Sequence, residues 1–77
     1  MKKITLDKMK SGKKGRVVEV SGGKVLENRL MSMGVYLGKD ITKISHFAMK
    51  GPVTIRAGRT VVALGHSMAH KISVEIE

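Results

Sequence analysis

The sequence contains no cysteine, one proline and only two aromatic residues in 77 positions. The absence of cysteine excludes a disulfide framework, a thiolate zinc site, an iron-sulfur cluster and a cysteine nucleophile. The fold therefore has to be stabilised by its apolar core, in a chain compatible with a reducing compartment. No long apolar run follows the basic residues 1–6, so we expect a soluble chain with neither a signal peptide nor membrane insertion.

Acidic residues are also scarce, since six of them stand against fifteen lysines and arginines and leave a formal net charge of +9. Such a charge favours acidic partners. Nucleic acid is one candidate, but proteins that bind single strands stack bases on aromatic side chains, and this chain has only Tyr36 and Phe47. Solvated lysines that keep the chain soluble are a simpler explanation. A basic nucleic-acid-binding small barrel is therefore the alternative function.

Catalytic motifs are missing as well. The carboxylates are scattered, and residues 65–69 (GHSMA) lack the last glycine of the G-x-S-x-G nucleophile elbow. Residues 34–40 (GVYLGKD) have three positions between the glycines where a phosphate loop has four, and Asp40 where Ser or Thr would hold magnesium. The sequence predicts a binding protein and not an enzyme.

Short alternating segments between glycines predict a mainly β fold. Residues 53–57 and 60–64 predict a hairpin in which Gly58 and Arg59 form a two-residue turn. In that register three pairs face each other: Ala57 with Thr60, Ile55 with Val62, and Val53 with Leu64.

Further strands are predicted at residues 16–20, at about 41–47 and at 72–76, with residues 4–6 as a short strand or lead-in. Ile41 and Ile44 have opposite parity, which predicts a bulge in the second of these strands. Together the segments predict one domain over residues 1–77, a small SH3-like barrel of about five strands with one inserted α-helix. An OB-like barrel is the alternative.

The inserted helix is expected to end at residues 29–34 (RLMSMG). At 100° per residue, one stripe carries, in angular order, Val25, Arg29, Met33, Leu26 and Leu30. Arg29 is therefore expected at the core edge, where it braces the helix end, and Gly34 is expected as the left-handed C-cap. Met31 points to the opposite, polar side, where an exposed methionine suits an adaptable contact with a protein partner.

His66 and His70 are four residues apart and on a helical turn could hold a divalent transition metal, iron or zinc. No cysteine accompanies them and no carboxylate lies nearby in the sequence, so two surface histidines are the alternative.

The sequence resembles the family of ferrous iron transport protein A, FeoA. The resemblance runs nearly end to end and rests on the order and spacing of these residues: Leu6, Met9, Gly12, Gly15, Arg29, Leu30, Met33, Gly34, Gly38, Gly51, Pro52, Ala63, Leu64, Ala69, Ile72 and Val74. The sequence departs from the family at Met49 and Lys50, where acidic residues are frequent, and at Gly65 and His66, where arginine often follows the Ala-Leu pair. The C-terminal domain of some metal-dependent repressors is similar too.

The resemblance implies an SH3-like barrel that acts as a small cytoplasmic accessory protein of ferrous iron uptake. Its implied partner is the membrane transporter FeoB, at the cytoplasmic region that carries a GTPase domain. The residues expected to contact the partner are Arg29, Met31, Gly34 and Met49. Self-association through a barrel edge remains open.

Overall fold

The computed structural model describes residues 2–46 and 51–76. It contains the strands β1 (Lys2–Thr5), β2 (Lys14–Val20), β3 (Asp40–His46), β4 (Val53–Ala57), β5 (Thr60–Leu64) and β6 (Ile72–Ile76). The helices are the 3-10 turn η1 (Leu6–Lys8), α1 (Gly23–Ser32) and α2 (His66–His70). The described residues include no helix long and apolar enough to cross a membrane.

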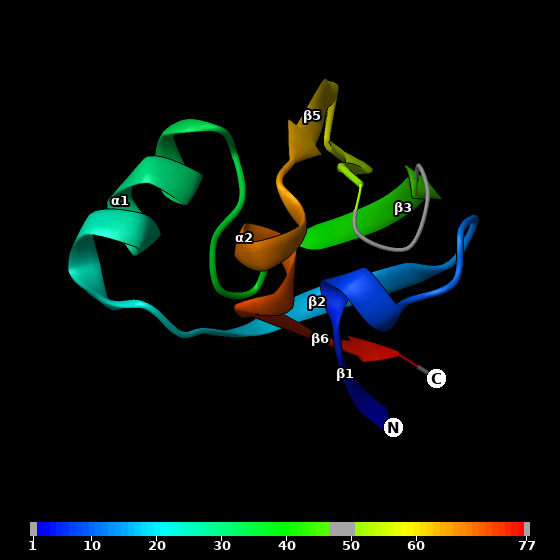
Figure 1. The fold of residues 1–77 in the computed structure, drawn as a ribbon, viewed down its shortest axis with the longest axis horizontal. Helices are drawn as coiled ribbons and strands as arrows, with labels where there is room; N and C mark the ends of the chain where they lie inside the picture. The colour runs from blue at the N-terminus through cyan, green and yellow to red at the C-terminus, as the bar shows by residue number, and fades with distance from the viewer. Residues whose placement is uncertain (1, 47–50, 77) are drawn as a thin grey trace.

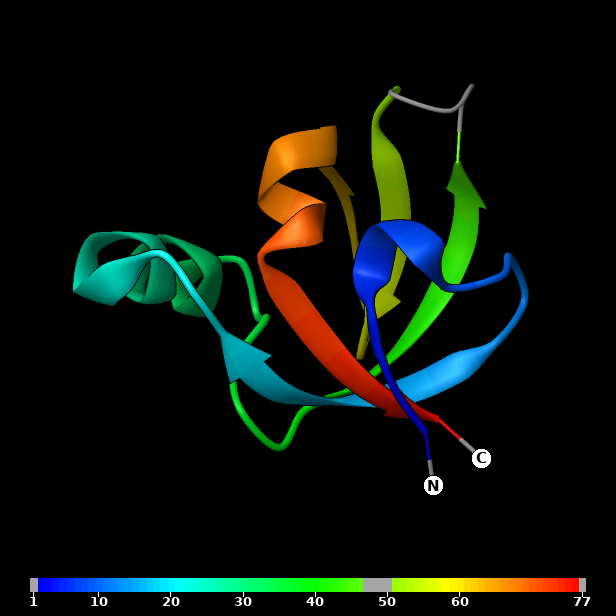
Figure 2. The same ribbon diagram turned by 60° about the horizontal axis from the view of Figure 1, so that its bottom comes forward.

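All six strands belong to one antiparallel sheet in the order β1-β6-β2-β3-β4-β5. The sheet is strongly curved, so β4 and β5 rise away from β2 and β6 (Figures 1 and 2). β1 and β5 are the edge strands, and α2 packs against η1 on the same side of the curved sheet (Figure 2). The architecture is the predicted mainly β, SH3-like barrel.

The inward residues of the strands form one apolar core. The predicted hairpin is confirmed, since β4 and β5 pair Ala57 with Thr60 and Ile55 with Val62 around a turn in which Gly58 has φ +64°. β6 alternates as predicted, with Ile72 and Val74 fully buried. The core also takes in residues from η1, α1 and α2: Leu6, Leu30 and Ala69.

The predicted irregularity in β3 is confirmed, because the pairing with β4 shifts register between Lys43 and Ser45. The bulge leaves Ile41 inside and Ile44 partly exposed. The inward position between these two isoleucines is taken by Lys43, which is 1 % exposed. The last predicted residue of this strand, Phe47, lies outside the described residues.

Two details differ from the sequence prediction. The sheet has six strands and not about five, because the segment predicted at residues 4–6 as a short strand or lead-in begins earlier, at Lys2, and pairs with β6 over four residues as β1. A second helix, α2, follows β5; it has only five residues, too few for a periodic pattern to indicate it from sequence.

Candidate partner-binding site

The end of α1 is fixed by a capping motif that turns the chain sharply. Gly34 has φ +86°, as the predicted left-handed cap requires. Its N–H donates to the carbonyl of Met31 at 3.0 Å, and the N–H of Val35 donates to the carbonyl of Leu30 at 2.9 Å. These two bonds form a Schellman motif, and the accompanying apolar pair, Leu30 and Val35, is buried. Gly34 therefore positions the loop after α1 through its backbone.

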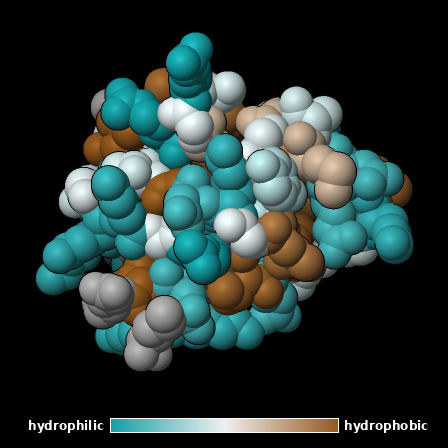
Figure 3. Space-filling view, turned by 180° about the vertical axis from the view of Figure 1, so that it is seen from behind, coloured by the Kyte–Doolittle hydropathy of each residue, from teal (hydrophilic) through white to brown (hydrophobic). Residues whose placement is uncertain are grey.

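The capped turn brings apolar side chains to the surface beside α1. Met31 is 57 % exposed, Leu37 is 58 % exposed and Tyr36 is 41 % exposed. They border a cleft of about 170 Å3, the α1 cleft, which is lined by Val20, Glu27, Met31, Val35, Tyr36 and Leu37. The surface seen in Figure 3 is largely hydrophilic with separate hydrophobic areas. A group of exposed apolar side chains around a hollow is the kind of surface that contacts a protein partner.

Met31 is thus exposed on the side of α1 that the sequence predicted. Near Met31, the side chain of Lys39 lies over the ring of Tyr36, with its Nζ 5.9 Å from the ring centroid. This placement puts a cation next to the apolar rim, and Glu27 supplies the acidic group of the cleft. The cleft can therefore hold an apolar side chain and contact polar groups on either side of it.

Arg29 is not in the place that the periodicity predicted. Its neighbour on the supposed stripe, Val25, is 84 % exposed, and Arg29 is exposed too. The buried side of α1 is centred on Leu30, because the helix lies beside the barrel and packs on β2 along a narrow face (Figure 1). In the described part of the chain the Arg29 guanidinium therefore does not stabilise the helix end as predicted. Only the backbone of Arg29 takes part there, since its carbonyl accepts a hydrogen bond from Ser32 Oγ at 2.7 Å. Met49, the remaining predicted contact residue, lies outside the described residues.

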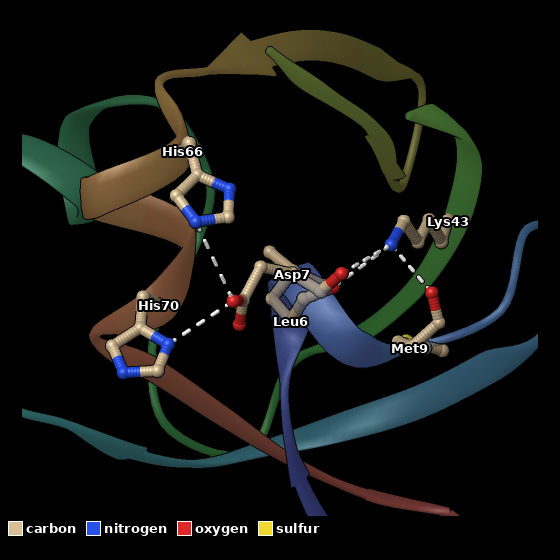
Figure 4. A network of polar contacts seen from close by, with 6 residues as sticks. All are labelled: Leu6, Asp7, Met9, Lys43, His66 and His70. Atoms are coloured by element: carbon tan, nitrogen blue, oxygen red, sulfur yellow. Dashed lines mark hydrogen bonds and ion pairs between the residues drawn. The ribbon is translucent and has the colours of Figure 1, made fainter. Parts of the chain in front are cut away.

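The two histidines of α2 face a carboxylate that lies far from them in the sequence. His70 Nδ1 lies 3.0 Å from Oδ2 of Asp7, and His66 Nε2 lies 3.8 Å from the same oxygen (Figure 4). The Asp7 side chain is 6 % exposed, so η1 presents a nearly buried carboxylate to α2. Asp7 is 63 positions away from His70, which is why no sequence spacing could reveal the contact.

Several opposing effects set the pKa of the Asp7 carboxyl. Burial by itself raises this pKa, but the Thr5 hydroxyl and the hydrogen bond and charge of His70 lower it, and the net pKa lies below the usual aspartate value. Asp7 is therefore a carboxylate at neutral pH, and its charged form is favoured by the fold.

On the other side of η1, Lys43 ties β3 to the backbone of the 3-10 turn. Its Nζ donates to the carbonyls of Leu6 at 3.2 Å and Asp7 at 3.1 Å, and also to the carbonyl of Met9 (Figure 4). Burial lowers the pKa of the Lys43 ammonium, and the charge of Asp7 opposes that change. The three N–H donors of an ammonium thus find three acceptors, which offsets part of the cost of burying it.

The described residues do not support the hypothesis that His66 and His70 belong to a metal site with further ligands. Among residues 2–46 and 51–76, no group of three or more His, Cys, Asp or Glu side chains is arranged to hold a metal ion. Both imidazoles contact the Asp7 side chain on one side of η1, and Lys43 contacts the backbone of η1 on the other. These contacts connect η1 with α2 and β3, which is a structural role.

Comparison with known proteins agrees with the resemblance that the sequence showed. The model of the FeoA domain matches residues 4–76. The chain belongs to the FeoA family. A protein of Campylobacter jejuni whose name describes an Fe(2+) transport protein A is 29 % identical over 73 residues, which cover 95 % of this chain and 99 % of that protein.

Solved structures of FeoA proteins share the fold of this family member. An iron uptake regulatory protein (FeoA) is 32 % identical, covers 97 % of each chain and superimposes with a TM-score of 0.86. A manganese-dependent transcriptional repressor has a TM-score of 0.87 at 20 % identity, covering 97 % of this chain and 42 % of its own. That second likeness shows the fold alone.

Proposed function

We propose that this FeoA-family chain is a small cytoplasmic accessory protein of ferrous iron uptake that binds the GTPase-bearing cytoplasmic region of a FeoB-type transporter. The α1 cleft is the proposed contact surface. Family membership supports the link to iron transport, and the exposure of Met31, Tyr36 and Leu37 around one hollow carries the choice of surface.

The proposed mechanism is docking without chemistry by this chain. A side chain of the partner enters the α1 cleft, and the apolar area of Met31 and Leu37 leaves water on binding. Gly34 acts indirectly, because its turn places Tyr36 and Leu37 next to Met31. Arg29 lies on the exposed surface of the same helix and is proposed to contact the rim of the partner. The positive net charge speeds the approach to an acidic face.

A titration followed by calorimetry and by amide NMR of the labelled chain tests this proposal. The cytoplasmic region of the cognate transporter is added to the isotope-labelled protein. We expect saturable heat and shifts of the amides of residues 30–37. Absence of both heat and amide shifts would remove the transporter as partner, because apolar burial alone can release little heat at about 25 °C. Shifts confined to β1 and β6 would remove the α1 cleft as the contact surface.

A further inference from the structure

A second cleft lies where the ends of four strands meet, and it has a different chemistry. Its volume is about 610 Å3. We call it the strand-end cleft; its lining is Lys13, Lys14, Gly15, Arg16, Asp40, Ile41, Thr42, Arg56, Gly58, Glu75 and Ile76. It shares no lining residue with the α1 cleft. The volume is in the range of ligand-binding pockets, roughly 300 to 1,000 Å3.

The strand register arranges the charges of this cleft in two rows. In the first row Arg16 pairs with Asp40 on β3 and with Glu75 on β6. Arg16 Nε donates to Asp40 Oδ1 at 3.0 Å, so this arginine lies between two carboxylates. The first row is therefore satisfied by charges of the protein itself.

The second row lies two residues away from the first on β2 and β3, on the same face of the sheet. Here Thr42 pairs with Lys14 on β2 and with Arg56 on β4. Among the described residues this row contains two cations and no carboxylate, and Arg56 forms no ion pair with any of them. Neighbouring strands are about 4.8 Å apart, so the two cations are anchored roughly 10 Å from each other.

The row continues onto β5 with an apolar residue. Arg56 pairs with Val61, which is 56 % exposed. From β2 to β5 the row therefore presents four groups in this order: the cation of Lys14, the hydroxyl of Thr42, the cation of Arg56 and the apolar side chain of Val61. Guanidinium groups bind carboxylates with two parallel hydrogen bonds, and a hydroxyl between the cations adds a donor.

From this mosaic we infer that the strand-end cleft, together with Val61 beside it on β5, binds an acidic protein segment, with carboxylates at Lys14 and Arg56 and an apolar side chain at Val61. A nucleic acid fits the mosaic less well for two reasons. Its closely spaced phosphates would meet Asp40 and Glu75 in the adjacent row, and the described residues that line the cleft include no aromatic side chain for base stacking. The inference is independent of the transporter as partner.

The test uses fluorescence anisotropy at low ionic strength with the whole chain. The probe is a fluorescein-labelled peptide with several glutamates and leucines, and its control has glutamine in place of glutamate. We expect saturable binding of the acidic peptide only. Arg56→Gln should weaken it about fivefold or more, since Arg56 contacts a carboxylate directly.

Arg59→Gln is the matched control, because Arg59 is an exposed arginine three residues away that does not line the cleft. It should change the affinity less than about twofold, as a charge acting only at a distance does. Equal weakening by the two substitutions would reduce the binding to net charge and overturn the inference. Tighter binding of a single-stranded oligonucleotide than of the peptide would overturn it as well.

Discussion

His70 Nδ1 lies 3.0 Å from Asp7 Oδ2 and thereby joins α2, near one end of the sequence, to η1, near the other. β1 and β6 are paired next to this contact, so the two ends of the chain are held together by a strand pair and by a charged hydrogen bond. The contact lies on the concave side of the sheet, where α2 packs against η1. It makes the stability of the fold dependent on the charge of one carboxylate.

Asp7→Asn should lower the free energy of unfolding by about 1 to 2 kcal/mol at pH 7, because a charge-assisted hydrogen bond is lost. The pKa of Asp7 is lowered in the folded state, so its contribution is complete above the pKa of the unfolded chain, about 3.9. The contribution disappears as the pH falls through the lower folded value. Urea unfolding of both proteins at neutral pH and at about pH 3 checks this. An undiminished difference in acid would contradict it.

Lys43→Met should cost about 2 to 3 kcal/mol of unfolding free energy, since three carbonyls around η1 lose their buried donor. Lys10→Met is the control, because Lys10 is exposed, and its effect should be within about 0.5 kcal/mol. Urea denaturation measures both. Equal stability of the two variants would mean that the buried ammonium contributes nothing net.

Gly34→Ala should lower the melting temperature, because an L-residue at φ +86° costs about 1 kcal/mol. No heavy atom lies within 4 Å of the position of the added Cβ, so the effect is conformational and not a clash. Gly65→Ala is the control, with equally open space but φ −60°. Gly65 is the N-cap of α2, where alanine is less favourable than glycine, but alanine also lowers the entropy of the unfolded chain, so the net change should be smaller than that of Gly34→Ala. Thermal unfolding that affects both variants equally would refute the role of the left-handed cap.

The metal hypothesis makes its own prediction. If His66 and His70 bind zinc or ferrous ion, calorimetry with either ion should give a heat that disappears in His70→Ala. Identical heats for the two proteins would dismiss the pair as ligands and leave the contact with Asp7 as their role.

The sequence predicted local structure well where turn chemistry and alternation agree. Gly58 sets the hairpin register, and the parity conflict between Ile41 and Ile44 indicated the bulge. The same alternation, counted from Ile41, places Lys43 inward, but a charged residue does not register as core in a hydrophobic pattern. The partners that make its burial acceptable are carbonyls more than thirty positions away.

The features that the sequence did not predict correctly depend on how the helices pack against the rest of the fold. Periodicity gives the relative angles of Arg29, Val25 and Leu30 but not which arc faces the barrel, and the lateral position of α1 leaves Arg29 in solvent. The contact between His70 and the Asp7 carboxylate could not be predicted from the sequence either, because Asp7 lies near the opposite end of the chain. The exposure of Met31 could be predicted because an apolar residue on the polar side of a helix can be recognised without knowing how the helix packs.

The most direct test of the proposed docking is the affinity of Met31→Asp for the cytoplasmic region of the transporter, measured by calorimetry. Val25→Asp is the control on the same helix, since Val25 is even more exposed and does not line the α1 cleft. If docking occurs through the α1 cleft, Met31→Asp weakens binding about tenfold or more, because a carboxylate replaces the apolar contact. Val25→Asp should retain the affinity of the unaltered chain. Unchanged affinity of Met31→Asp, or equal loss in both variants, would contradict docking through the α1 cleft.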